Sequence, residues 1–197
     1  MLWTKRFDVL TRPSIGTWVC VLLLAFTVMP GCMHRIAVHP LPSHPANATI
    51  PRSLQVVVSS LTIQGADHMP GITLLEWTAR DLAQAVLHYA RQRGTFTSVS
   101  GNSADLVMKL TARLSMISQG PYVYRIELHA DVGTATDPIK SYDVEGSAIG
   151  SAVRWVTASD RDPIEAALQS SLEDLLTNIE SDRSLYLIKE PARSSKP

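Results

Sequence analysis

Two consecutive stretches between residues 106 and 132 alternate apolar and polar side chains, and this pattern restricts the fold more than any other feature of the sequence. In the first stretch the apolar residues are Leu106, Met108, Leu110, Ala112, Leu114 and Met116. After Gly120-Pro121, the second stretch repeats the alternation with Tyr122, Tyr124, Ile126, Leu128, Ala130 and Val132. Because successive side chains of a strand point to opposite faces, the pattern predicts a hairpin of two long strands with one buried face.

Further elements are predicted before this hairpin. The β-branched stretch 54–58 predicts a first strand, and residues 95–99 predict another short strand. Between them, apolar residues at helical spacing predict a helix from Leu75 to Arg93. Gly94 is typical of the residue that ends a helix.

A third long strand and a second helix are predicted after the hairpin. Beyond a turn near Asp137-Pro138, residues 142–150 continue the alternation, and their small side chains favour close packing of a helix. The sequence Asp162-Pro163-Ile164-Glu165 is typical of a helix start, with Asp162 as the N-cap. Residues 184–188 predict a last short strand. The apolar stripe of the helix comprises Ile164, Leu168, Leu172, Leu175 and Ile179.

Together these elements predict an α+β domain. Helices with one apolar stripe and strands with one apolar face can bury each other in two layers. We therefore expect a two-layer sandwich, in which a mostly antiparallel sheet of four to five strands carries two helices on one face. The other face of the sheet is then exposed and presents Lys109, Arg113, Arg125, Glu127, His129, Asp143 and Glu145.

The first 32 residues have the composition of an export signal. Basic residues precede an apolar run from Ile15 to Met29, which ends in Pro30-Gly31-Cys32. This run is shorter than the roughly 20 apolar residues of a membrane-spanning helix. Three alternatives stay open: a lipoprotein signal, an uncleaved anchor and plain secretion. The lipoprotein signal is favoured, because a cysteine directly after Gly31 resembles the lipobox of bacterial lipoproteins, although Met29 stands where family members usually carry Leu.

The lipobox resemblance implies a signal peptide over residues 1–31, cleavage between Gly31 and Cys32, and modification of Cys32 by lipid such as palmitate. The other cysteine, Cys20, leaves with the signal, so the mature chain has no internal disulfide. Met33 follows the lipidated cysteine in place of Asp. By resemblance to enterobacterial sorting, this favours the outer membrane, with the domain facing the periplasm.

The remaining chain is expected to have three parts. Residues 32–52 are predicted to be a Pro-rich tether, because prolines favour extended chain. Residues 53–189 form the single α+β domain, and residues 190–197 form a disordered tail. Three histidines of the tether recur every five residues, a spacing that fits neither a strand face nor a helix face, so no metal site is predicted. They are His34, His39 and His44.

Composition and motifs favour neither nucleic-acid binding nor catalysis. The formal net charge is zero, and no basic stripe with interleaved aromatic residues is present. The stretch Gly146-Ser147-Ala148-Ile149-Gly150 resembles the nucleophile motif Gly-x-Ser-x-Gly, but its second glycine comes one residue too late. Its small residues are therefore interpreted as packing residues of a strand. Glu127, His129 and Asp131 share one strand face, which is interpreted as a solvated mixed-charge surface. We therefore expect no enzyme activity and no cofactor.

Element order and two stretches of sequence resemble small bacterial envelope lipoproteins. The stretches are Gly94-Thr95-Phe96, followed by Ser103-Ala104-Asp105-Leu106, and the helix start Asp162-Pro163-Ile164-Glu165-Ala166-Ala167-Leu168. The group includes the lipopolysaccharide-assembly, curli-secretion and penicillin-binding-protein-activator lipoproteins. This resemblance implies an accessory role in a larger envelope machine, as a scaffold, plug or activator, and not catalysis.

The sequence therefore predicts a membrane-anchored lipoprotein that is a non-enzymatic interaction module of an envelope assembly or transport machine. Its partners are expected to be the membrane, through the lipid, and an envelope protein. The alternative is a lipoprotein that binds a small amphiphile or glycan between helices and sheet. The expected interaction surface comprises Arg113, Arg125, Glu127, His129 and Trp155.

Overall fold

The computed structural model describes residues 33–65, 74–118, 120–150 and 158–187 of the chain. The chain divides into two compact units, residues 1–32 and residues 33–197, and the fold below is that of the second unit. The predicted signal peptide with its cleavage site at Gly31 and Cys32, the candidate surface residue Trp155 and the C-terminal tail lie outside the described residues.

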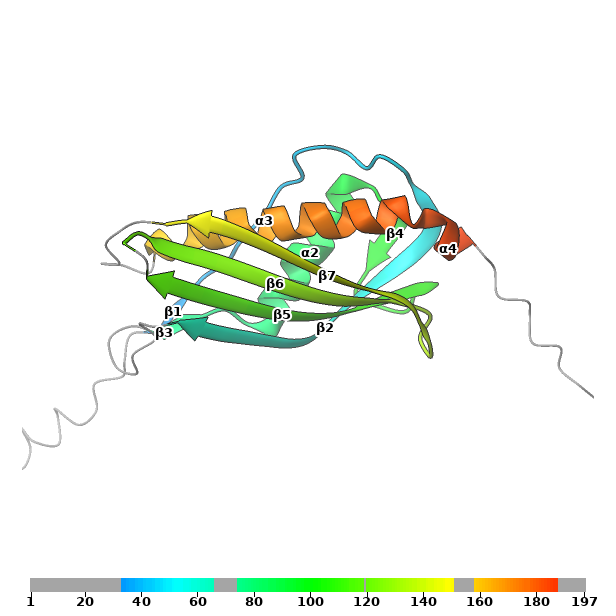
Figure 1. The fold of residues 1–197 in the computed structure, drawn as a ribbon. Coiled ribbons are helices and arrows are strands. Elements are labelled where there is room, and N and C mark those ends of the chain that lie inside the picture. The colour runs from blue at the N-terminus through cyan, green and yellow to red at the C-terminus, as the bar shows by residue number, and fades with distance from the viewer. Residues whose placement is uncertain (1–32, 66–73, 119, 151–157, 188–197) are drawn as a thin grey trace, which may run out of the picture. The chain divides into compact units, whose positions relative to one another are not determined.

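A five-stranded sheet forms one layer of the domain (Figure 1). Its order is β4 (Phe96–Ser100), β2 (Ile50–Gly65), β5 (Leu106–Ser118), β6 (Tyr122–Gly133) and β7 (Pro138–Ile149). The α+β class and the five strands are as predicted. The sheet is mixed, however, because β2 pairs in parallel with both β4 and β5, whereas the β5–β6 and β6–β7 pairs are antiparallel. The helix that lies between β2 and β4 returns the chain to the end of the sheet at which β2 begins. Parallel pairing of β2 with β4 requires such a crossover.

The predicted hairpin is present, with Ser118 opposite Tyr122 and Leu110 opposite Ala130. All the alternating apolar residues of β5 lie in the core, as do those of β6 from Tyr124 to Val132. The next strand confirms the packing interpretation of the small residues. A Cβ added to Gly146 would lie 2.2 Å from the carbonyl oxygen of Ala167, so β7 and the helix above it are in direct backbone contact.

Two long helices lie on one face of the sheet (Figure 1). The helix α2 (Ala79–Arg93) packs on β2 and β4, and α3 (Ala158–Ser181) packs on β6 and β7. The start of α2 was expected at Leu75, but residues Leu74–Glu76 form the short strand β3. Thr78 caps the helix instead, in a reciprocal pair of hydrogen bonds with Asp81. Gly94 ends it as predicted, with a positive φ of 80°.

Two predictions near the C-terminus are wrong. The described part of α3 begins at Ala158, so Asp162 is not its N-cap and Pro163 lies inside the helix. Proline is tolerated near a helix start, which is why the motif gave a boundary that is too late. Residues 184–187, expected in a strand, belong to the short helix α4 (Arg183–Leu187). This helical turn buries Tyr186, whose hydroxyl lies 2.7 Å from that of Tyr142.

The segment predicted as a free tether is bound to the domain along its length. Residues Met33–Arg35 form β1, which pairs in parallel with β3. Ile36 and Val38 are buried, with exposed fractions of 2% and 3%. The chain then passes over the helix layer to the start of β2 (Figure 1). We call residues 36–49 the strap. Prolines keep it extended and have no backbone N–H that would need a partner, so composition alone does not distinguish a strap from a tether.

Candidate functional site

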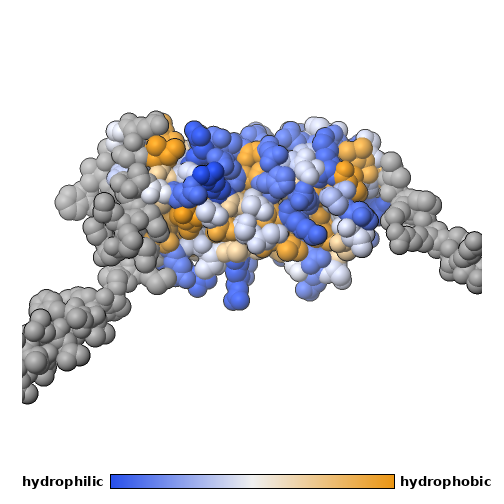
Figure 2. Space-filling view, turned by 60° about the horizontal axis from the view of Figure 1, so that its bottom comes forward, coloured by the Kyte–Doolittle hydropathy of each residue, from blue (hydrophilic) through white to orange (hydrophobic). Residues whose placement is uncertain are grey.

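The side of the sheet opposite the helices carries most of the predicted surface residues. We call the exposed side chains of β5, β6 and β7 on this side the outer face. Strand register places them in rows: Arg113 beside Glu127 and Glu145, and Thr111 beside His129 and Asp143. Hydrophilic side chains project among paler and apolar residues on the side that Figure 2 brings forward. Arg113, Arg125, Glu127 and His129 therefore share one exposed surface, as predicted.

Charge is distributed unevenly across the outer face. Strand β5 contributes the cations Lys109 and Arg113, and β7 contributes the anions Asp143 and Glu145. Ion pairs join neighbouring strands: Arg125 Nε lies 2.9 Å from Glu145 Oε1, and Arg113 Nη1 lies 3.7 Å from Glu127 Oε2. All of these side chains are about half exposed, so the pairs stabilise the fold by little, on the order of 0–1 kcal/mol each.

His129 lies between two carboxylates at the centre of the outer face. Its Nδ1 is 2.7 Å from Asp143 Oδ1, and its Nε2 is 3.4 Å from Asp131 Oδ1. The hydrogen bond with Asp143 is the main cause of a raised pKa of His129, and the charge of Asp131 adds to the effect. The imidazole therefore holds its proton to a higher pH than an ordinary histidine does.

Thr111, His129 and Asp143 lie in one row, an order that superficially matches nucleophile, base and orienting acid. The geometry does not match that chemistry. The Nε2 atom, which would accept the nucleophile's proton, faces the carboxylate of Asp131 instead, at 3.4 Å. The row is also open to solvent. The row is therefore a set of exposed polar and charged side chains.

A shallow hollow lies over the rows of Thr111 and Arg113 on the outer face. Two further hollows lie beside α2 and beside α3, on the outside of the helix layer. The space between helices and sheet, where the alternative prediction places an amphiphile, is filled by side chains that are fully buried. Among them are Leu82, Met108, Leu110, Ile126, Leu168 and Leu172.

Neither a metal centre nor a membrane-spanning helix is found in the described ranges. Among these residues, no group of three or more His, Cys, Asp or Glu side chains is arranged to hold a metal ion. No helix of the same residues is both long and apolar enough to cross a membrane.

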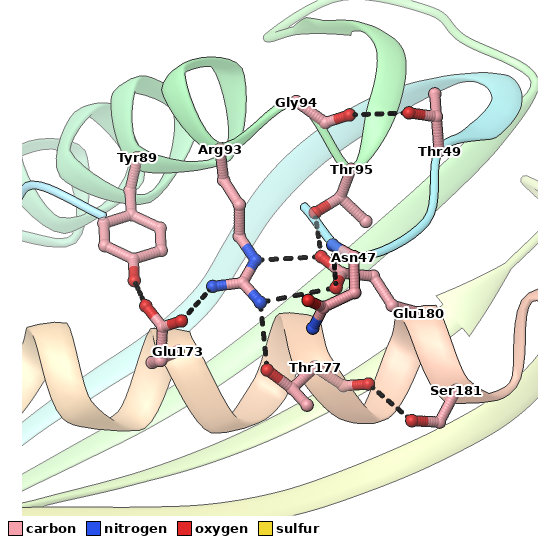
Figure 3. Close-up of polar contacts among 10 residues, drawn as sticks. All are labelled: Asn47, Thr49, Tyr89, Arg93, Gly94, Thr95, Glu173, Thr177, Glu180 and Ser181. Atoms are coloured by element: carbon pink, nitrogen blue, oxygen red, sulfur yellow. Dashed lines mark hydrogen bonds and ion pairs between the residues drawn. The ribbon is translucent and has the colours of Figure 1, made fainter. Parts of the chain in front are cut away.

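A second polar cluster lies inside the helix layer and was not predicted (Figure 3). Arg93, at the end of α2, has a side chain that is 1% exposed. Its guanidinium donates through Nε and Nη2 to Glu180 on α3, at 2.8 and 3.3 Å. It also donates to Thr177 and to Glu173, and Glu173 accepts a further hydrogen bond from the Tyr89 hydroxyl at 2.5 Å. We call these residues the clasp.

The clasp also binds the strap. The backbone N–H of Asn47 donates to Glu180 Oε2 at 3.0 Å, and the Thr95 hydroxyl donates to Glu180 Oε1 at 2.6 Å. One residue earlier, the N–H of Ala46 donates to the carbonyl oxygen of Arg93 at 2.8 Å. The clasp therefore joins α2, α3 and the strap, and its buried position makes it a structural element.

The charged state of the clasp is set by its hydrogen bonds. Burial alone raises the pKa of Glu180, but the hydrogen bonds from Arg93 and Thr95 outweigh burial and leave the pKa lowered. Glu173 shows the same balance between burial and hydrogen bonds from Tyr89 and Arg93, and its pKa is also lowered. The sequence indicates Arg93 as a helix-end cation off the apolar stripe, but it stands four residues after Tyr89 and is buried on the same side of α2.

Comparisons with known proteins give structural likenesses only. No protein-family model matches the chain, and no curated protein matches it. A DUF330 protein from Xanthomonas campestris is 16% identical with a TM-score of 0.48, covering 78% of this chain and 95% of that chain. A hypothetical protein from Chlamydia trachomatis is 11% identical with a TM-score of 0.43, covering 66% and 97%.

A candidate lipoprotein from Caulobacter crescentus also has a similar structure. It is 11% identical with a TM-score of 0.40, and the match covers 71% of this chain and 93% of that chain. The likeness to lipopolysaccharide-assembly, curli-secretion and penicillin-binding-protein-activator lipoproteins stays a prediction. Because these TM-scores are below 0.5, the function proposed below is based on the residues of this chain.

Proposed function

We propose that this chain is a lipid-anchored, non-enzymatic accessory protein of the bacterial cell envelope, which docks on a membrane-protein machine through its outer face. Anchoring is proposed at Cys32, directly after a short apolar run and Gly31. The outer membrane, with the domain in the periplasm, is the proposed location. The single observation that supports docking is the outer face itself, a charged surface that the described helices leave uncovered.

The charge distribution defines the kind of partner. A protein that places acidic groups over Lys109 and Arg113, and basic groups over Asp143 and Glu145, matches the outer face. The ion pairs within the face are exposed and weak, so they can be exchanged for pairs with a partner at small cost. Charge complementarity of this kind determines orientation and specificity more than affinity.

The anchor is tested by Cys32→Ser. Membrane fractionation and intact-mass measurement of the wild-type protein should show a membrane-bound chain that starts at residue 32 and carries acyl groups. The variant should lose the added mass and leave the membrane fraction or keep its uncleaved signal. Cys20→Ser is the matched control and should behave as wild type. A Cys32→Ser protein of unchanged mass, still membrane-bound, would show that the lipoprotein assignment is wrong.

Docking is tested by photocrosslinking in intact cells. A photoreactive side chain at Thr111, on the outer face, should give an adduct of defined mass with an envelope protein, whereas one at Gln92, exposed on α2, should not. Arg113→Glu should reduce the yield of the adduct, and Arg80→Glu, on α2, should leave it unchanged. Equal adducts from both faces, or a yield that does not depend on Arg113, would exclude the outer face as the docking surface. An adduct with lipid or glycan, and none with a protein, would show that the outer face binds a small ligand and would contradict docking on a protein.

A further inference from the structure

We propose that the domain rests on the membrane surface by the end at which β1 lies, with its strands and α3 directed away from the bilayer. We call this end the β1 end. The inference rests on the lipidation of Cys32 proposed above. It adds the orientation of the domain and identifies a second interaction surface, whose partner is the phospholipid headgroup layer.

Strand register defines the two ends of the domain. β1 lies at the end where β2 and β5 finish (Figure 1). At this end Ser118 is opposite Tyr122, and β7 finishes with Ile149 opposite Val123. The turn between β6 and β7, at residues 134–137, lies at the other end. Since β6 has 12 residues, the two ends are about 35–40 Å apart at roughly 3.3 Å per residue.

The strap leaves no free chain between the lipid and the domain. Cys32 is directly bonded to Met33, the first residue of β1. Two residues later the Arg35 guanidinium lies 2.7 Å from Asp81 Oδ1, and the Ile36 N–H donates to the Glu76 carbonyl at 3.0 Å. Neighbouring Cα atoms are about 3.8 Å apart. A lipid on Cys32 is therefore within a few residues' reach of the β1 end.

Contacts along the strap show that the chain does not double back. His39 N–H donates to Glu165 and the Gln169 amide donates to Ser43, so the strap follows α3 from its beginning towards its end. Asn47 then contacts Glu180, and the Ile50 N–H donates to the Thr95 carbonyl at the far end of the domain. A free tether of 20 residues would reach at most about 70 Å. Because these residues are bound to the domain, they do not extend the distance between the lipid and the domain.

The orientation is tested with the lipidated protein in vesicles of phosphatidylethanolamine and phosphatidylglycerol. A fluorophore is attached at Ile149→Cys, at the β1 end, or at Ala135→Cys, in the distal turn; both positions are exposed. Vesicle lipids carry a nitroxide on the headgroup, which quenches on contact. Quenching should be several-fold stronger at position 149 than at position 135. A Gly/Ser linker inserted between Cys32 and Met33 should abolish the difference.

Each outcome bears on a different claim. Intact mass reports lipidation independently of quenching, so an unlipidated wild type overturns the proposed function and the orientation with it. Equal quenching at both positions on a lipidated chain overturns the orientation alone. Stronger quenching at position 135 would also overturn it, because it would place the distal turn, near the exposed apolar residue Ile139, at the bilayer.

Discussion

At the scale of single residues, His129 and Arg93 show how differently this protein uses its charges. His129 lies on the open outer face between carboxylates, where solvent weakens every interaction. Arg93 is enclosed in the clasp, where all three of its guanidinium nitrogens donate hydrogen bonds and the loss of a partner leaves a buried polar group unpaired. The two residues therefore call for different measurements, a titration for His129 and a stability measurement for Arg93.

The titration of His129 should report its carboxylate partners. Its pKa is raised in the folded protein, so the contribution of its ion pairs to stability is complete below the ordinary pKa of about 6.5 and is lost as the pH rises through the folded value. NMR of the imidazole should give a pKa above that of an ordinary histidine. Asp143→Asn should lower it, and Asp131→Asn should lower it less, since that carboxylate is farther away. An unchanged titration in Asp143→Asn would contradict the pairing.

Arg93→Met should be one of the most destabilising single changes in the domain. It leaves Glu180 buried without its cation, and the removal of one partner of a buried pair costs about 3–5 kcal/mol. Denaturant unfolding measures the loss. Arg80→Met, exposed on the same helix, should stay within about 0.5 kcal/mol of wild type. The double change Arg93→Met with Glu180→Met should recover much of the stability, and a double variant no more stable than the single one would contradict this account.

At the scale of elements, close contact between β7 and α3 determines which residues each can carry. Gly146→Ala would place a methyl group 2.2 Å from the Ala167 carbonyl oxygen and 2.5 Å from Ser171 Oγ. The carbonyl is part of the α3 backbone, and the Ser171 hydroxyl is buried and already hydrogen-bonded, so neither group can move away easily. We expect a loss of about 1–3 kcal/mol or more in unfolding free energy. Ser147→Ala, exposed on the next residue, should be neutral, and a neutral Gly146→Ala would show that the two elements can separate.

The strap should be visible to hydrogen exchange. The N–H groups of Ala46 and Asn47 donate to acceptors in the domain at 2.8 and 3.0 Å, so they should exchange much more slowly than unstructured chain. The N–H of Ala135, in the exposed distal turn, provides a comparison within the same protein. Strap amides that exchange as fast as that of Ala135 would support the free tether that the composition predicts.

At the scale of the whole molecule, the sequence predicts the helix and sheet layers but not the strap that is bound across the helices. Alternation identifies β5 and β6 because one face of each strand is buried and the other is exposed. Gly94 marks the end of α2 because the last turn requires a residue with positive φ, which is a local requirement. The strap depends on contacts with residues far along the chain, which no local pattern reveals. Ile36, Val38 and Pro40 are buried at alternate positions, a short signal that the surrounding prolines obscure.

The candidate site divides in the same way. Alternation was sufficient to place Arg113, Arg125, Glu127 and His129 on one exposed surface. Residues one turn away from Glu173 within α3 carry no positive charge, but the fold provides Arg93 and Tyr89 from another helix. Partners of this kind are determined by the packing of α2 against α3 and not by spacing within either.

The strap has a further consequence for the order of folding. It is close to the start of the chain, yet its contacts with Glu165 and Glu180 on α3 join residues that are 126 and 133 positions apart. Contacts of such long sequence separation form late, because the closure of long loops costs entropy before any contact compensates for it. The strap therefore cannot complete its docking until the last long helix has been synthesised and packed. A segment that precedes most of the domain in the sequence is therefore among the last to be fixed, and its docking marks the completion of the domain.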